Sequence, residues 1–270
     1  MIGMAGRLRL VVGLDGAGRC SIREQYNSQL HRVLQLVPGE AAEEGIVYLL
    51  NPTGGIVQGD DLEAEIRVEA GAHAIVTAPS ATKVYRMDRG GATAKTRLRV
   101  DAGATLEYLP EPLIPHAGAR FVEDLELEVA PGGCALAWEV LTPGRAARGE
   151  SLAYDRLEFR LRVLEGPRTV LLERSVIVPA DGLEGPAVMA DGTYYGILVA
   201  IGGEDPARLE AALRGVTGDS RAGVSRLRGT GVVLKALTRD SRSLHALLHR
   251  AREAATPILA GRPATPLRRT

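Results

Sequence analysis

Apolar and polar residues alternate along most of the chain between Arg7 and Val178. From residue 61 to residue 68, for example, aliphatic side chains alternate with charged ones, and residues 125–129, 136–140 and 157–163 repeat the pattern. A period of two places successive side chains on opposite faces of a strand. The sequence therefore predicts a mainly β-structure over residues 7–200, with glycine and proline between the strands as turn residues.

A strand, a glycine turn and a second strand recur four times along the chain. The turn glycines are Gly71, Gly103, Gly132 and Gly166, which are 32, 29 and 34 residues apart. A period of about thirty is typical of units that stack and bury one face against the next. The expected fold class is all-β, mainly antiparallel and elongated, with superhelical or stacked sheets. An ordinary all-β protein also places hairpins at such intervals, so that alternative stays open.

Two segments near the C-terminus carry helix signals instead of strand signals. Residues 205–215 begin with Asp205 as a cap and Pro206 at the first helical position, an arrangement that favours helix initiation. Residues 240–256 show apolar positions at helical spacing and are predicted to end before Pro257, because the residue before a proline disfavours helix.

The sequence indicates one domain. No linker separates the predicted helices from the sheet, so residues 1–270 are predicted to form a single domain, with residues 257–270 as a mobile tail.

Residues 221–270 hold eleven Arg and Lys against Asp240 and Glu253, which gives this part a net charge of +9 in a chain whose net charge is zero. This basic end could dock on an acidic partner, or its arginines could simply be solvated.

Cysteine usage and hydropathy favour a soluble cytoplasmic protein. Cys20 and Cys134 are far apart and show no CxxC spacing, which indicates neither a zinc site nor a disulfide framework. The N-terminus interleaves arginine with apolar residues and lacks the core of a signal peptide, and no segment approaches the ~20 apolar residues of a membrane span. Because 33 basic residues balance 33 acidic ones, overall charge gives no attraction to nucleic acid.

Common catalytic motifs are absent from the sequence, which contains no GxxxxGK[ST] loop, no GxSxG elbow and no strand followed by GxGxxG. His245 and His249 lie one turn apart on the second predicted helix, a spacing that a metal can bridge. The glutamate of the HExxH motif is missing between them, and Arg250 and Arg252 after them indicate the solvent side of the helix. These histidines are expected to be ordinary surface residues, and no catalytic residue is expected.

The most distinctive stretch of the chain runs from Leu49 to Arg86. Its turn contains a proline, three glycines and an acid at the exit, namely Pro52, Gly54, Gly55, Gly59 and Asp60. Such a turn indicates a backbone that approaches another segment closely. The order Pro-x-Gly-Gly-hydrophobic-hydrophobic-x-Gly-Asp, followed by a strand, a Gly-Ala turn and Thr-x-x-x-x-Thr-Lys-hydrophobic-Tyr-Arg, resembles the signature of the UreD (UreH) family of urease accessory proteins. The second segment holds Thr82, Lys83 and Tyr85.

Later segments extend the resemblance. Residues 231–237, before the second predicted helix, also fit the family, so the resemblance covers nearly the whole chain. Residues 106–114, which include Glu111, are similar to the Leu-Glu-aromatic-Leu-Pro segment of the family, although Pro112 stands where a polar residue is more usual. Residues 144–150 are similar to the family's Gly-Arg-x-x-x-Gly-Glu segment, and its matching positions here are Gly144, Arg145, Gly149 and Glu150.

The resemblance implies an all-β accessory protein with two helices that catalyses no reaction itself. It also implies that the protein binds a UreF-type accessory protein, recruits a UreG-type GTPase through it, and docks on apo-urease as a scaffold or chaperone. Nickel would then reach the urease active site with help from this chain. No tightly bound cofactor is implied, only transient contact with Ni²⁺, and neither nucleic acid nor membrane is an expected partner.

Two carboxylates are the first candidates for transient nickel contact along an internal water path. Asp60 ends the glycine turn, and Glu173 interrupts an apolar strand next to Arg174. Weak, exchangeable oxygen ligands suit the transit of an ion better than tight ones. The structural alternatives are that Asp60 caps its turn, that Glu173 forms an ion pair, and that Glu150 pairs with Arg145 or Arg148.

Two other classes of function stay open at this point. A β-solenoid carbohydrate-active enzyme would need a column of carboxylates on one face at the repeat spacing, and the four repeats contain none. A non-enzymatic β-rich interaction module would be expected to be exported, and no signal peptide is recognisable.

Overall fold

The computed structural model describes residues 3–183, 189, 192–218 and 220–267. Over these residues the chain forms mostly β-strands, with two α-helices and two short 3-10 helices. In chain order the strands are β1 (Ala5–Leu14), β2 (Cys20–Ser28), β3 (Arg32–Pro38), β4 (Glu44–Leu50), β5 (Asp61–Val68), β6 (His73–Thr77), β7 (Thr82–Val84), β8 (Ala92–Val100), β9 (Thr105–Leu109), β10 (Leu113–Pro115), β11 (Arg120–Val129), β12 (Cys134–Leu141), β13 (Arg156–Glu165), β14 (Arg168–Ile177), β15 (Tyr194–Ile201), β16 (Ala222–Arg226) and β17 (Val232–Thr238). The helices are η1 (Ala146–Arg148), η2 (Pro179–Asp181), α1 (Pro206–Thr217) and α2 (Ser241–Leu259).

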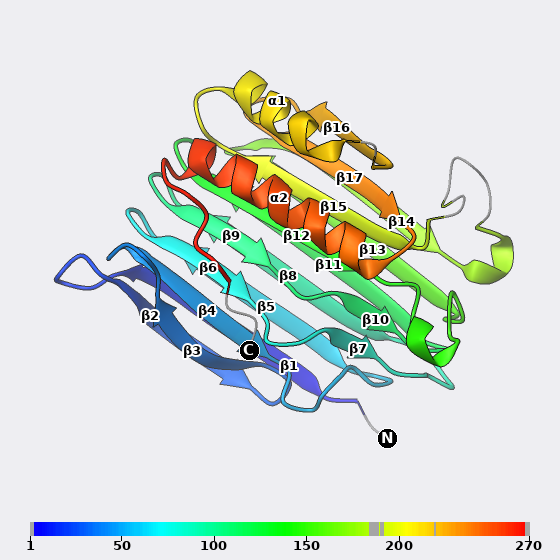
Figure 1. Ribbon diagram of the computed structural model, residues 1–270. Coiled ribbons are helices and arrows are strands. Elements are labelled where there is room, and N and C mark those ends of the chain that lie inside the picture. Colours follow the sequence, from blue (N-terminus) through cyan, green and yellow to red (C-terminus); the bar gives the residue numbers. More distant parts are fainter. Residues whose placement is uncertain (1–2, 184–188, 190–191, 219, 268–270) are drawn as a thin grey trace.

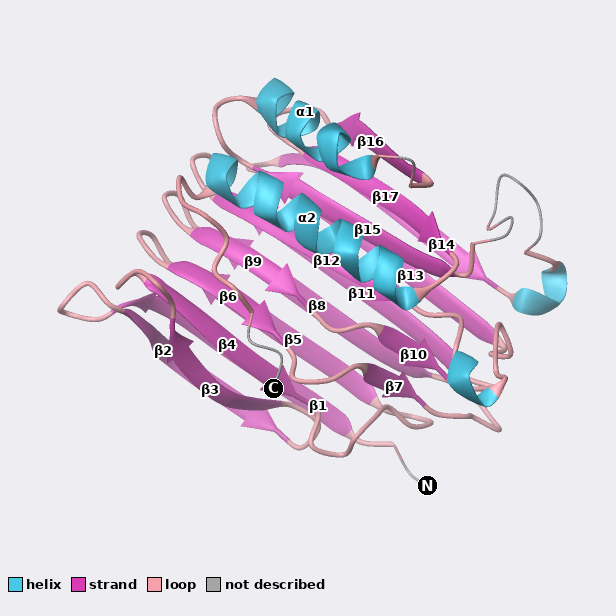
Figure 2. Ribbon diagram, in the orientation of Figure 1, coloured by secondary structure: helices cyan, strands magenta, loops and turns pink. Residues whose placement is uncertain are grey.

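The strands form two sheets that pack face to face, and the two α-helices cover the outer face of one of them (Figures 1 and 2). The first sheet has the order β14-β13-β11-β8-β5-β1-β2. The second has the order β16-β17-β15-β12-β9-β6-β4-β3, with β7 and β10 attached through β12. The predicted all-β class with stacked sheets and two late helices is confirmed.

The chain passes between the two sheets in successive coils. Strands β5, β8 and β11 lie in the first sheet. A turn leads from each of them to a strand of the second sheet, from β5 to β6, from β8 to β9 and from β11 to β12. Because every coil repeats the same path, neighbouring strands from successive coils run in the same direction. β5 pairs with β8, β8 with β11, β6 with β9, and β9 with β12, all in parallel. The expectation of mainly antiparallel pairing is therefore wrong for the centre of both sheets.

Three of the four predicted repeat turns stack on one another. The amide of Gly71 donates to the carbonyl of Gly103 at 3.0 Å, and the amide of Gly103 donates to the carbonyl of Gly132 at 2.9 Å. All three adopt positive φ, which glycine reaches without a steric penalty. Gly166 differs, because its turn joins β13 to β14 within the first sheet as an antiparallel hairpin. The fourth repeat is thus a hairpin and not a further coil.

Helix α2 extends further than its sequence predicts, since it continues through Pro257 to Leu259. Proline at this position removes one hydrogen bond to the carbonyl of Glu253, but both residues lie on the solvent side of the helix, where water can replace that bond. Leu259 in the last turn is buried in the apolar cluster beneath the helices, which favours the extra turn.

The segment after α2 was expected to be a mobile tail from residue 257. Its described part instead runs along the outer face of the second sheet (Figure 1). Thr265 is buried, Leu267 packs on the apolar cluster under the helices, and Arg262 forms an ion pair with Glu43. Residues 268–270 lie outside the described residues.

Three apolar clusters hold the layers together. One fills the space between the two sheets and contains Leu10, Ile66 and Leu127, all fully buried. A second lies between the second sheet and the helices, around Leu198 and Leu244. The third is smaller and packs at the end of the sandwich where β7 and β10 lie. Among the described residues, no helix is long and apolar enough to cross a membrane.

Candidate functional site

A cavity of about 210 Å³ lies between the two sheets, next to the main apolar core. Both sheets contribute to its wall, and its polar lining is spread among apolar side chains. A cavity of this size has room for several water molecules, since each needs at least about 10–15 Å³ of this volume. Its polar lining residues are His31, Asn51, Thr77, Ser80, Thr82, Lys83, Lys95, Thr96, Tyr108, Glu111, Glu123, Glu139, Glu173, Ser175 and Tyr195.

Three glutamates from three different strands face this cavity. Glu123 belongs to β11, Glu139 to β12 and Glu173 to β14. Their direction follows from strand alternation, because Glu123 shares a face with the buried Leu125, and Glu173 lies opposite the buried Leu161 in the adjacent strand. The interior of the sandwich therefore contains carboxyl groups in positions that an ordinary β-core fills with aliphatic side chains.

Glu173 both forms an ion pair and lines the cavity, which are the two alternatives that the sequence left open. One carboxylate oxygen lies 2.5 Å from Nζ of Lys235 on β17, and the other accepts a hydrogen bond of 3.2 Å from the hydroxyl of Tyr195. Its side chain also lines the cavity. The Lys235 side chain is about half exposed, at 46%, so this ion pair stands between the cavity and the solvent along the side of the sandwich.

Burial changes the ionisation of the other two glutamates. Burial, together with the charge of Asp124, raises the pKa of Glu123 to about 7. Burial and the neighbouring charges of Glu123 and Glu173 raise the pKa of Glu139 well above the usual range of a carboxyl group. At neutral pH the interior therefore carries less negative charge than three free carboxylates would.

The cavity reaches the surface between two loops that contain the distinctive sequence segments. Gly54 lines it from one loop, and Pro79 and Ser80 from the other, which leads into the short strand β7 with Lys83. All four residues are exposed. Glu111, the predicted candidate after β9, lies in the same wall. The motif residues Gly54, Gly55, Thr82, Lys83 and Glu111 are thus brought together at the mouth of the cavity, although they come from three separate segments.

Close backbone contact explains one glycine of the first motif. A Cβ atom at Gly55 would lie 2.5 Å from the ring of Tyr85 and 2.8 Å from the carbonyl oxygen of Lys83. The amide of the next residue, Ile56, donates to that same carbonyl at 2.8 Å, and the hydroxyl of Tyr85 lies 3.4 Å from the carbonyl of Gly54. Gly55 and Tyr85 therefore hold the two loops of the mouth against each other.

Asp60 lies outside the cavity wall and is buried among backbone amides. Its carboxylate accepts hydrogen bonds from the amides of Val57 at 2.9 Å and Met4 at 3.0 Å. The side chain is almost fully buried. These contacts are those of the capping alternative, in which Asp60 closes its own turn and ties the N-terminal strand to it.

The last motif segment forms a separate brace at the same end of the sandwich. Nε of Arg145 donates to the carboxylate of Glu150 at 2.8 Å, and that carboxylate also accepts a hydrogen bond from the amide of Ala117. At Gly144 a Cβ atom would lie 2.9 Å from the carbonyl oxygen of Glu150. Gly149 adopts φ 77° and ends the short helix η1. This segment positions the chain after β12 and does not line the cavity.

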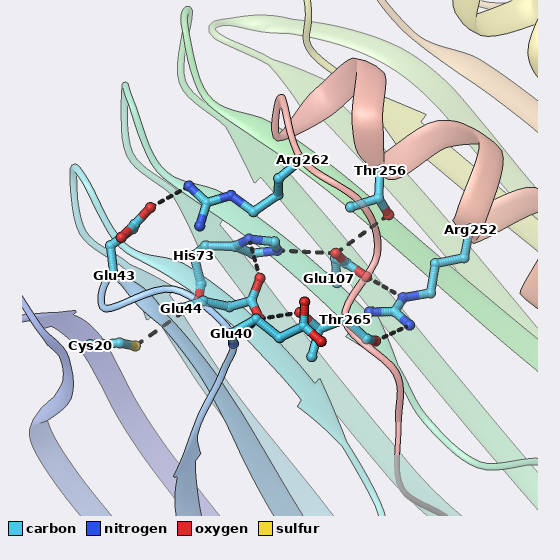
Figure 3. Close-up of polar contacts among 10 residues, drawn as sticks. All are labelled: Cys20, Glu40, Glu43, Glu44, His73, Glu107, Arg252, Thr256, Arg262 and Thr265. Carbon is cyan, nitrogen blue, oxygen red and sulfur yellow. Dashed lines mark hydrogen bonds and ion pairs between the residues drawn. The ribbon is translucent and has the colours of Figure 1, made fainter.

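A buried charge network lies at the opposite face of the second sheet, under α2 (Figure 3). The two ring nitrogens of His73 lie 3.0 Å from Glu107 and 3.2 Å from Glu44. Arg252 of α2 pairs with Glu107 and donates at 2.8 Å to the carbonyl of Thr265, whose hydroxyl bonds to Glu44. The network thus joins β4, β6 and β9 to helix α2 and to the C-terminal segment.

The ionisation of His73 is set by opposing effects. Burial lowers its pKa, but hydrogen bonding to Glu107 and Glu44 and their negative charges outweigh burial and raise it. For Glu44, burial raises the pKa, but contacts with His73 and Thr265 outweigh it and hold the value at about 2. When His73 is protonated, the network contains two positive and two negative side chains and is balanced.

Arg252 corrects one expectation about α2. The sequence places Arg252 on the solvent side, but its side chain is only 3% exposed. Burial is possible because Glu107 neutralises the guanidinium and Thr265 accepts one of its hydrogen bonds. His245 and His249 are half-buried on the same helix, and the ring of His249 meets Trp138 edge-on at 5.4 Å.

Sequence reasoning misses Glu123 and Glu139, although a signal for both exists. The alternation of Phe121, Leu125 and Leu127 places Glu123 on the buried face of its strand. Glu139 interrupts the apolar run of β12 in the same way that Glu173 interrupts β14. Within the described part of the chain, no three His, Cys, Asp or Glu side chains are arranged to hold a metal ion together.

Comparison with known proteins adds an independent line of observation. A family model described as "UreD urease accessory protein" matches residues 4–270. A "Urease accessory protein UreD" from Haloarcula marismortui is 38% identical over 228 residues, which cover 82% of this chain and 76% of that protein. One from Opitutus terrae is 37% identical, over 75% of this chain and 76% of that protein. "Urease accessory protein UreD 2" from Streptomyces griseus is 32% identical over 98% of this chain and 93% of that protein.

Proposed function

The chain belongs to the UreD urease accessory protein family, and from this membership we propose that it is a non-catalytic scaffold in the maturation of urease. Its described residues form a body of two packed sheets, with motif segments gathered at one end. The observation that carries the proposal is the polar cavity, because an interior lined by exchangeable oxygen ligands suits the passage of an ion and not its storage.

We further propose that the protein acts in a complex with a UreF-type protein, a UreG-type GTPase bound through it, and apo-urease. Nickel is the cargo of this complex. The motif loops around Gly54 and Lys83 would receive the ion at the mouth of the cavity, because they reach both the solvent and the interior.

Inside the cavity, Glu123, Glu139 and Glu173 would take the place of water ligands that nickel loses on entry. Each comes from a different strand, and the wall around them is mostly apolar, with hydroxyl groups and two lysines among its other side chains. Glu173 also pairs with Lys235. Ligands spread along a path release an ion more readily than ligands gathered into one site, since release then breaks few bonds at a time. Asp60 is not part of this proposed path, because its carboxylate is occupied by the amides of Val57 and Met4.

The scaffold role is tested by co-expressing the chain with a UreF-type protein and apo-urease and purifying the complex through a tag on urease. We expect this chain and the UreF-type protein to co-elute with urease, and we expect the co-elution of the UreF-type protein to be lost when this chain is omitted. A folded chain that never co-elutes would contradict the scaffold role.

The role of the cavity is tested with Glu139→Gln and Glu123→Gln, against Glu126→Gln as a matched control. Glu126 lies on the same strand as Glu123 but faces outward, where it contacts Arg97 and Arg162. We expect the first two variants to co-elute normally and to lower the nickel content of purified urease, measured by plasma mass spectrometry. Equal nickel content in all three complexes would argue against transit through this cavity.

A further inference from the structure

The edge strand β14 has two apolar side chains that no other part of the described structure covers. Leu172 is 73% exposed and Val176 is 43% exposed. Both face outward. They lie opposite Arg162 and Glu158 of the neighbouring β13, and these two residues point away from the interior because Leu161, next to Arg162, points into it and is buried. β14 ends the sheet and pairs on one side only among the described strands. A long apolar edge strand with free backbone groups is a site for pairing with another chain.

The charges beside these apolar residues are positive in excess. Arg156, Arg160 and Arg174 all contact the single carboxylate of Glu158, at 3.2, 2.6 and 2.9 Å. Arg160 also lies 3.4 Å from Asp124. Three arginines and two carboxylates leave a net charge of +1, and each of these arginine side chains is about half exposed. Among the ion pairs of the described residues, the guanidinium groups of Arg156 and Arg174 contact only the carboxylate of Glu158, and each keeps donors for another carboxylate.

The strongly basic C-terminal part of the sequence is a weaker candidate for the same kind of partner. Arg226 pairs with Glu210, Lys235 with Glu173, and Arg252 with Glu107. Much of its charge is therefore used within the fold, whereas the arginines on β13 and β14 retain an excess beside exposed apolar side chains.

We propose that the free edge of β14 is a docking strand for an extended acidic segment of a partner protein, which adds to the first sheet as a further strand. Alternate apolar side chains of that segment cover Leu172 and Val176, and its carboxylates bind the arginines around Glu158. Main-chain hydrogen bonds supply affinity in this mode of recognition, and the alternating side chains supply selectivity. The proposal deepens the scaffold function and rests on it, since the partner belongs to the urease maturation complex.

The docking strand also lies next to the cavity. Glu173 is on the same strand as Leu172 but points inward, where it forms the ion pair with Lys235 that closes the side of the sandwich. In Figure 1 β14 lies behind β15 and β17, from which Tyr195 and Lys235 reach Glu173. A partner strand on β14 would therefore sit directly beside this closing contact.

The first test is hydrogen–deuterium exchange of the wild-type chain, alone and in the complex with the UreF-type protein and apo-urease. We expect amides of the β14 peptide to exchange at least about tenfold more slowly in the complex, because a partner strand would bond the free edge. A complex that forms without protection of β14 overturns the docking site and leaves the scaffold function standing. Failure of the wild-type complex to form overturns both.

The second test compares variants at the two edges of the same sheet. Leu172→Asp with Val176→Asp, and separately Arg174→Glu, are expected to lower co-elution by about tenfold or more, because both introduce negative charge that repels an acidic segment. The matched controls are Tyr26→Asp on the opposite edge strand β2 and Arg9→Glu on the neighbouring β1. Tyr26 is 59% exposed, and Arg9 lies opposite it and pairs with Glu24 on the surface. Unchanged co-elution of the β14 variants would also overturn the proposal. Circular dichroism confirms that each variant is folded.

Discussion

At the scale of single residues, polar groups inside this fold are arranged in two different ways. The network around His73 is closed, since each of its charged side chains contacts a group of opposite charge. The network around Glu139 in the cavity is not closed in this way. Its carboxyl groups are spread along a wall, and among the described residues a cationic partner is found for Glu173 alone. A closed buried network supports structure, and an open one retains capacity to bind something else.

His73→Gln is expected to destabilise the fold in a pH-dependent way. Because the pKa of His73 is raised on folding, its contribution is complete below its unfolded value of about 6.5 and is lost as the pH rises through the folded value. The variant leaves Glu44 without its cation, whereas Glu107 keeps Arg252. Breaking a buried pair costs on the order of 3–5 kcal/mol. Thermal unfolding at pH 6 to 9 should show the deficit of the variant shrinking as pH rises. A constant difference across this range would contradict the assignment.

At the scale of elements, the C-terminal segment acts as a clamp over the second sheet. Thr265 bonds to Glu44, and its carbonyl accepts from Arg252, so the segment closes the polar network from outside. The segment lacks helix and strand, yet Thr265 within it is buried.

Thr265→Val tests this clamp against Arg262→Gln in the same segment. The first change leaves the buried carboxylate of Glu44 short of a donor, which should cost about 1–3 kcal/mol. The second removes a partly exposed ion pair with Glu43, for which about 0–1 kcal/mol is expected. Differential scanning calorimetry should rank the losses in that order. Similar losses for both would indicate that the segment contributes only through surface charge.

Strand positions in this protein are readable from the sequence, but their partners are not. The alternation of apolar residues places the strands from β5 to β14 and even the inward direction of Glu173. Parallel pairing depends on which sheet each strand enters after its turn, and the turns at Gly103 and Gly166 look alike in sequence while one crosses between sheets and the other does not. The alternation of apolar and polar residues does not specify whether the chain stays in one sheet or crosses to the other after a turn.

The same limit applies to the candidate site. The motif glycines and Lys83 are found from the sequence, because their spacing is distinctive. The network of Glu44, His73, Glu107 and Arg252 joins residues up to 208 positions apart, from 44 to 252. No local pattern specifies such contacts, and an isolated arginine on a helix resembles any solvated arginine.

At the scale of the whole molecule, the cavity is a structural weakness that the rest of the sandwich tolerates. Carboxyl groups with raised pKa must take up protons on folding at neutral pH, which opposes folding. The extensive apolar clusters on both sides of the second sheet supply the stability that this arrangement requires. Sites retained for function often reduce stability in this way.

Glu139→Gln should therefore raise the melting temperature, by roughly 2–4 °C for each kcal/mol recovered. The gain should be larger at pH 8 than at pH 5, because the wild-type penalty grows as the pH rises above the ordinary pKa of a carboxyl. Calorimetry at the two pH values measures it, with Glu126→Gln on the outer face as the control. A melting temperature that falls at both pH values would show that the charged carboxylate stabilises the fold.

The stacked turns at Gly71, Gly103 and Gly132 make the coil a repeating structural unit. Each coil repeats the path of its neighbour and is joined to it by the same parallel pairing and the same turn contact. Duplication of one coil would lengthen the sandwich by about thirty residues and leave the motif loops, the helices and the edge strands in their own surroundings. Insertion of one such coil would therefore change the length of the sandwich and leave both of its ends unaltered.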